Sequence, residues 1–226
     1  MSEELGKISK PQADNIQLKR KLYLVQNIQN YFPDNNEFEV LLNEYWESIS
    51  EQLDNLEKTA GSINKIYVEG IYQDFEIATK LLEENNKWCL NTISSRIKSG
   101  SEFGKIEEEN NYKELIDWTR IAQMGFVSEN VKEMAEKNYT DVINTRSKII
   151  QDEIDNLKNG EAALFLISSG SHKFPEDVEI FNVIPPSLDK MNRWITENQK
   201  VNNEANEEQR NQNEGEGNNK SDLWTP

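Results

Sequence analysis

The chain has 226 residues, a net charge of −16 and a hydrophobic content of 35%. No run of about 18 apolar residues occurs, and the first residues lack the basic start and apolar segment of a secretory signal, so we expect no membrane contact. Because negative charge repels phosphate groups, we do not expect a nucleic acid as a binding partner. Cations or a basic protein remain open as partners. Because the single cysteine, Cys89, cannot form an internal disulfide, we expect a cytoplasmic protein and a buried Cys89.

Short apolar runs rich in β-forming residues predict strands. Residues 1–20 are polar, contain Pro11 and show no periodicity, so they are expected to form a flexible lead-in. The run 103–107 is the weakest of the predicted strands because it is short and contains two charged residues. The five predicted strands are 21–25, 65–69, 103–107, 162–168 and 178–184.

Apolar residues that recur every three or four positions predict helices between these strands. The loop of residues 33–36, Pro-Asp-Asn-Asn, has the composition of a turn followed by a helix N-cap, and Ser128 is a second expected N-cap. The last long pattern is expected to break near residues 138–140 because of its length. The predicted helices are 38–56, 74–86, 88–97, 111–124, 128–157 and a last one that begins at Ser187.

Strands that alternate with helices and are apolar on both faces predict an α/β fold with a largely parallel sheet flanked by helices. We expect one domain over residues 21–199. Residues 200–226 are rich in Asn, Glu, Gln and Gly, which predicts a disordered acidic tail. A docking role for Leu223 and Trp224 within this tail is left open.

The candidate site follows from the rule that ligands bind beyond the carboxyl ends of parallel strands. Gln29 follows the first strand, Glu69 ends the second, and the strand 162–168 runs into the only histidine, His172. A histidine and a carboxylate can bind a divalent metal or act as an acid/base pair. Glu107, at the end of the weak strand, is expected to belong to a solvated charge cluster with its two acidic neighbours.

These strand ends resemble the superfamily that includes TraB, the Tiki proteases, erythromycin esterase and the haem-binding protein ChaN. Members have a Gly-x-x-His after the first strand, a Glu-Gly after the second, an arginine on a late helix and a second Gly-x-x-His. The matching segments here are Gln26–Gln29, Glu69–Gly70, Thr145–Ser147 and Ser169–His172. The resemblance covers about residues 21–195.

The resemblance implies roles for these residues. Glu69 and His172 would be catalytic residues and metal ligands, with Mn, Co or Zn as the metal, and the implied binding residues are Gln29, Arg146, Ser169 and Gly170. Gln26, Gln29 and Ser169 stand where the family has glycine, histidine and glycine. Because a neutral glutamine amide is a weaker metal ligand than an imidazole, we expect a non-catalytic binding or scaffold domain.

Other interpretations stay open at this point. The first is a metal-dependent hydrolase in which Glu69, His172 and either Glu107 or Asp34 hold a metal that activates water. The others are structural: His172 can be a hydrogen-bonded residue at a strand end, Glu69 a solvated strand end, and Arg146 a surface residue. The tryptophans are expected to pack in or beside the core, since no basic stripe surrounds them.

Overall fold

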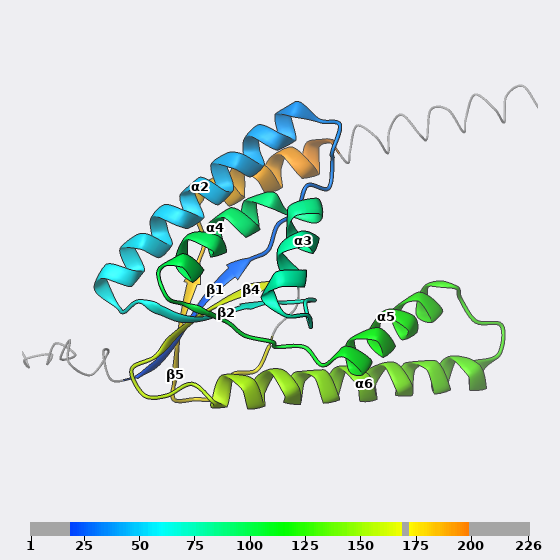
Figure 1. Cartoon of the computed structure of the whole chain (residues 1–226). Helices are drawn as coiled ribbons and strands as arrows, with labels where there is room; N and C mark the ends of the chain where they lie inside the picture. The colour runs from blue at the N-terminus through cyan, green and yellow to red at the C-terminus, as the bar shows by residue number, and fades with distance from the viewer. Residues whose placement is uncertain (1–18, 169–171, 199–226) are drawn as a thin grey trace, which may run out of the picture.

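The computed structural model describes residues 19–168 and 172–198, which form a three-layer α/β domain (Figure 1). The sheet has five parallel strands in the order β3-β2-β4-β1-β5. This confirms the predicted α/β class with a parallel sheet. The strands are β1 (Arg20–Gln26), β2 (Ile63–Val68), β3 (Glu102–Phe103), β4 (Ala162–Ile167) and β5 (Val178–Val183).

Five helices connect these strands, and a further helix spans residues 186–198. The N-cap of the first of them lies in the loop where it was expected: it is Asn35, whose side chain accepts a hydrogen bond from the Phe38 amide at 2.9 Å. Ser128 occupies the other predicted N-cap but makes no capping hydrogen bond with its side chain. The five are α2 (Asn36–Thr59), α3 (Phe75–Asn85), α4 (Lys87–Lys98), α5 (Glu109–Gln123) and α6 (Glu129–Asp155).

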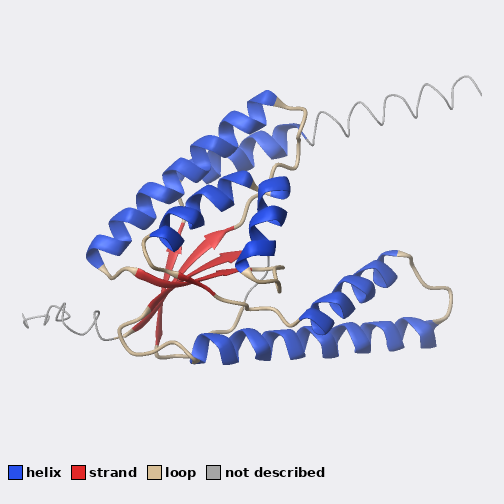
Figure 2. Ribbon diagram, in the orientation of Figure 1, coloured by secondary structure: helices blue, strands red, loops and turns tan. Residues whose placement is uncertain are grey.

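Helices cover both faces of the sheet, which explains why its central strands are apolar on both sides. Helices α2, α3, α4 and 186–198 lie on one face, where Tyr23 and Leu164 are fully buried (Figure 2). The C-terminal half of α6 covers the other face and packs Ile150 and Ile154 against Phe165 of β4. The central strand β4 therefore contributes side chains to two separate cores.

Several details differ from the predicted elements. The last helix begins at residue 186, so Ser187 lies inside it and is not its N-cap. Strand β1 begins at Arg20, inside the expected lead-in. The third strand contains only Glu102 and Phe103, so Glu107 is not a strand end. Helix α6 runs unbroken through residues 138–140, where the side chains of Asn138 and Thr140 donate to carbonyls one turn back and so do not compete with the helix. The expected tail, with Leu223 and Trp224, lies outside the described residues, as does most of the lead-in.

The prediction for Cys89 is confirmed, as is the prediction for three of the tryptophans; Trp118 is half-buried on α5 and belongs to neither apolar core. Cys89 is fully buried, and this burial raises the pKa of its thiol. Trp46 and Trp194 belong to the core, while Trp88 packs against its margin. Within the described ranges, no helix is both long and apolar enough to cross a membrane.

Candidate functional site

An ionic cluster lies at the carboxyl ends of β2 and β4, where the sequence placed the site. Arg146, from the middle of α6, donates from Nη2 to Oε1 of Glu69 at 2.8 Å. Its Nε donates to Oε2 of Glu107 at 2.9 Å, and Nη2 also bonds Oε1 of Glu107. One guanidinium thus binds both carboxylates with the fork geometry that suits arginine.

Backbone amides hold the two carboxylates in place. The Ser168 amide, just past β4, donates to Oε2 of Glu69, and the Gly70 amide donates to Oε1 of Glu107 at 3.0 Å. Strand pairing continues into the site, because the Glu69 amide bonds the Leu166 carbonyl at 2.9 Å. The parallel pairing of β2 with β4 therefore decides where the Glu69 side chain lies.

Gly70 is required at its position for two reasons. Its φ of +86° is a conformation that residues with a Cβ rarely adopt, and a Cβ there would lie 2.9 Å from the Tyr112 hydroxyl. The Tyr112 ring in turn lies 6.0 Å from the Arg146 guanidinium carbon. In the Glu69–Gly70 pair, Glu69 thus provides the carboxylate that binds Arg146, and Gly70 provides the turn that leaves room for Tyr112.

His172 completes the cluster from the connection between β4 and β5. Its Nε2 lies 3.3 Å from Oε1 of Glu69, within ion-pair range, but makes no hydrogen bond of good geometry within the described chain. The imidazole packs beside Phe165 and Phe174, with ring centroids 5.4 and 6.1 Å away. Aromatic side chains and the Glu69 carboxylate therefore fix the ring at the end of the sheet.

Burial and hydrogen bonding act against each other on Glu69, which is 6% exposed. Burial raises its pKa, but the nearby His172 imidazole, the Ser168 amide and the Arg146 charge lower it to about 2. Burial lowers the pKa of Arg146, but its bonds to Glu107 and Glu69 raise it overall. Glu69 is thus ionised at neutral pH, and a carboxylate of such low pKa is a weak general base.

The predicted site residues separate into three groups. Glu69, Arg146 and His172 come together, as the resemblance implied. Gln29 and Asp34 are exposed in the loop that follows β1, outside the cluster of hydrogen bonds around Arg146. Ser169 and Gly170 lie outside the described residues.

Glu107 is the clearest correction to the sequence analysis. We expected a solvated charge cluster, but Glu107 is only 6% exposed and binds Arg146 and the Gly70 amide. A single buried charge within three consecutive glutamates is not visible in a sequence, because burial depends on where α6 packs. Tyr112 was also missed, and nothing in the sequence distinguishes it from the other tyrosines.

The cluster does not fit a metal ion as it is arranged. Two carboxylates and an imidazole are acceptable ligands for Mn, Co or Zn. However, Arg146 already takes oxygens of both carboxylates, and backbone amides take others. Within the described ranges, no three His, Cys, Asp or Glu side chains are grouped so that they could hold a metal.

Comparisons with protein-family models, with curated proteins and with solved structures find no match. A function therefore has to be inferred from the chemistry of the cluster around Arg146.

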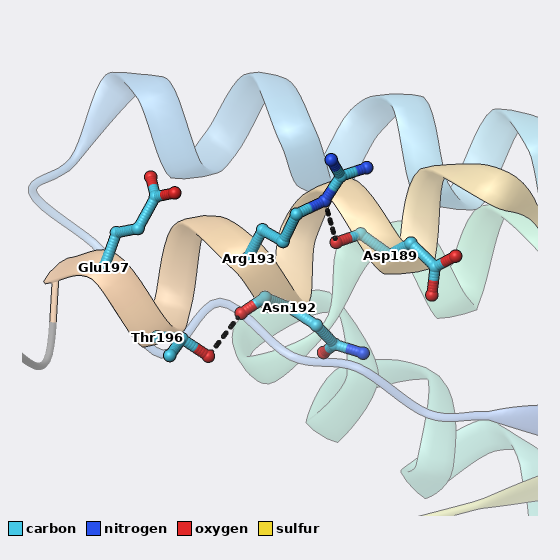
Figure 3. A pocket seen from close by; sticks show the side chains of 5 residues that line it. All are labelled: Asp189, Asn192, Arg193, Thr196 and Glu197. Carbon is cyan, nitrogen blue, oxygen red and sulfur yellow. Dashed lines mark hydrogen bonds between the residues drawn. The ribbon is translucent and has the colours of Figure 1, made fainter.

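A separate hollow of about 480 Å³ lies on the helix 186–198 (Figure 3). All of its described lining residues come from this one helix. The hydrogen bonds among them run along the helix, from Arg193 to the Asp189 carbonyl and from Thr196 to the Asn192 carbonyl. This hollow is thus the outer face of a helix rather than a cleft between elements.

Proposed function

We propose that the chain is a non-catalytic member of the TraB/Tiki/ChaN-like group that acts as a binding or scaffold domain. The observation that supports this proposal best is that Arg146 binds both carboxylates, Glu69 and Glu107. A buried guanidinium between two carboxylates joins α6 to the end of β2 and to the segment that follows β3, which is a structural role. The exposed Gln29 agrees with this view, since it stands where the family has its first histidine.

A metal-binding experiment tests this proposal. Elemental analysis of the purified full chain should find no stoichiometric Mn, Co or Zn, and adding each ion should leave the melting temperature unchanged. Stoichiometric metal that disappears in His172→Ala, but not in the exposed neighbour Lys173→Ala, would overturn the proposal. Because ligand binding stabilises the folded state, a shift in melting temperature on metal addition is a sensitive readout.

The second candidate function is a metal-dependent hydrolase with a rearranged Glu/His site. The observation that favours it is the buried Nε2 of His172, which lacks a well-aligned hydrogen bond although Glu69 is 3.3 Å away. This candidate requires Arg146 to release at least one carboxylate. Hydrolysis of ester or peptide substrates that depends on Mn, Co or Zn and is lost in His172→Ala would favour it over the scaffold proposal.

A further inference from the structure

Helix α5 and the N-terminal half of α6 form a hairpin that projects away from the sheet (Figures 1 and 2). The two helices are antiparallel, and the side-chain amide of Asn111 on α5 donates to the Val142 carbonyl of α6 at 3.2 Å. In the α/β body, helices bury apolar residues against the sheet. The outer part of this hairpin has no sheet beneath it, so its side chains are available to a partner.

Large apolar side chains are exposed at the outer end of the hairpin. Val131 is 52% exposed and Met134 is 63% exposed. Nine large apolar side chains of the described chain are exposed, and four of them lie between Met124 and Met134. Such a concentration is unusual for a free surface and is typical of an interaction site.

One stripe along α6 carries both apolar and acidic residues. Val131, Met134, Asn138 and Asp141 are spaced by three, four and three residues, which puts them on one face of the helix. From Val131 to Asp141 the stripe spans about 15 Å at the usual helical rise. It is thus apolar at the end of the hairpin and acidic nearer the sheet.

The acidic part of the stripe borders a groove of about 620 Å³ between α5 and α6. Glu108, Glu114 and Asp141 line this groove, and no lysine or arginine is among the described residues that line it. Trp118 lines it as well and offers an aromatic face of the kind that attracts cations. The groove therefore favours a positively charged side chain.

Asn111 supplies an independent indication that this groove takes a ligand. It lines the groove, is only 8% exposed, and its Oδ1 has no hydrogen-bond partner within the described chain. Its amide nitrogen is already used by the Val142 carbonyl. A buried acceptor without a partner is costly, and a donor that enters the groove would reduce that cost.

We propose that the hairpin face, formed by Trp118, Val131, Met134, Asn138 and Asp141, binds a basic amphipathic helix of a protein partner. Apolar residues of that helix pack on Val131 and Met134, and a lysine or arginine enters the groove beside Asp141. A partner segment of about three helical turns spans the stripe. The net charge of −16 favours a basic partner over a second copy of this acidic chain.

This inference concerns a surface that is separate from the Arg146 cluster. Peptide binding tests the hairpin inference, whereas metal binding tests the scaffold proposal. The two can therefore fail independently.

Fluorescence anisotropy with synthetic peptides tests the inference on the full chain. The probes are a panel of labelled helical peptides of about three turns, with leucines on one side and lysines at varied distances from them. At least one peptide should bind saturably, and its affinity should fall with salt. The matched peptide with glutamate for lysine should bind about tenfold more weakly or worse, a difference of about 1.4 kcal/mol.

Two double variants locate the binding surface. Val131→Ser with Met134→Ser, and separately Glu114→Gln with Asp141→Asn, should each weaken binding by about tenfold, and the second should also reduce the salt dependence. The matched controls change exposed residues elsewhere: Val40→Ser with Ile77→Ser, and Glu83→Gln with Glu84→Gln. The controls should bind as the wild type does, and circular dichroism should show all four variants to be folded.

Three results would overturn the inference. One is the absence of saturable binding across the whole panel, and another is equal binding by the hairpin variants and the wild type. The third is self-association in ultracentrifugation that disappears in Val131→Ser with Met134→Ser while peptide affinity is unchanged, since the occupant would then be a second copy.

Discussion

Arg146 is the residue that joins the two halves of the candidate site. Its side chain is 16% exposed, while the Glu69 and Glu107 side chains are 4% and 1% exposed. Two buried carboxylates with one guanidinium leave net negative charge in a region of low dielectric, and the Gly70 and Ser168 backbone amides offset part of it. Removing the cation would expose the full desolvation cost of both anions.

Arg146→Ala should therefore lower the free energy of unfolding by about 3–5 kcal/mol, the range typical of a broken buried ion pair. Arg146→Lys should fall between this variant and the wild type, because lysine keeps the charge but lacks the fork. Urea denaturation measures the free energy of unfolding of both variants. The exposed Arg120→Ala, whose partner Asp117 is also exposed, serves as the control and should change stability by less than about 1 kcal/mol. A similar loss in the two alanine variants would contradict this role for Arg146.

The low pKa of Glu69 makes stability depend on pH. Because this pKa falls from 4.5 to about 2 on folding, the stabilisation it provides is fully present above pH 4.5 and is lost as the pH falls toward 2. This stabilisation amounts to about 3 kcal/mol of unfolding free energy at neutral pH. Glu69→Gln should be less stable than the wild type at pH 7 and should lose less stability between pH 5 and pH 2. Equal acid sensitivity of Glu69→Gln and the exposed control Glu83→Gln would count against this account.

At the scale of single elements, the start of α4 shows how a loop is held in position. Asn86 is 1% exposed and is the N-cap of α4, where its side chain accepts from the Cys89 amide at 3.1 Å. Its amide nitrogen donates to Asn27 at 2.9 Å and to the Ile28 carbonyl at 3.0 Å. One side chain thus caps a helix and fixes the chain that leaves β1.

Asn86→Ala should consequently cost more than the loss of an ordinary cap. We expect a decrease of about 2–4 kcal/mol in the free energy of unfolding, the sum of a lost cap and buried groups left without partners. Asn35→Ala, which removes only the cap of α2, should cost about 1 kcal/mol. Chemical denaturation of both variants provides the measurement, and equal losses would show that the bonds of Asn86 to Asn27 and Ile28 contribute nothing.

At the scale of the whole molecule, the body and the hairpin differ in how they are packed. Helix α2 has 24 residues and buries seven side chains, whereas α6 has 27 residues and buries four. In α6, Ile150 and Ile154 pack against the sheet, while its N-terminal part packs on α5 alone. The hairpin is therefore the part of the fold that can open at the lowest cost.

Hydrogen exchange should reveal this difference. Amides of residues 116–136 should exchange faster than those of α2 and of the central strands β1 and β4, because opening the hairpin exposes little core. Mass spectrometry of peptic fragments measures the protection. If a basic peptide binds the hairpin face, protection should rise in this region, and uniform protection across both regions would contradict the packing argument.

The sequence by itself determined the element order, the parallel sheet and three members of the candidate site. Apolar runs and helical periodicity are local properties, so β4, α2 and the carboxyl-end position of Glu69 and His172 could be predicted from neighbouring residues. Tertiary structure alone decided that Glu107 is buried and that α5 and α6 form a projecting hairpin. The reason is physical: burial of a charge and exposure of an apolar stripe depend on which distant element packs there, and α6 covers the sheet with only its C-terminal half.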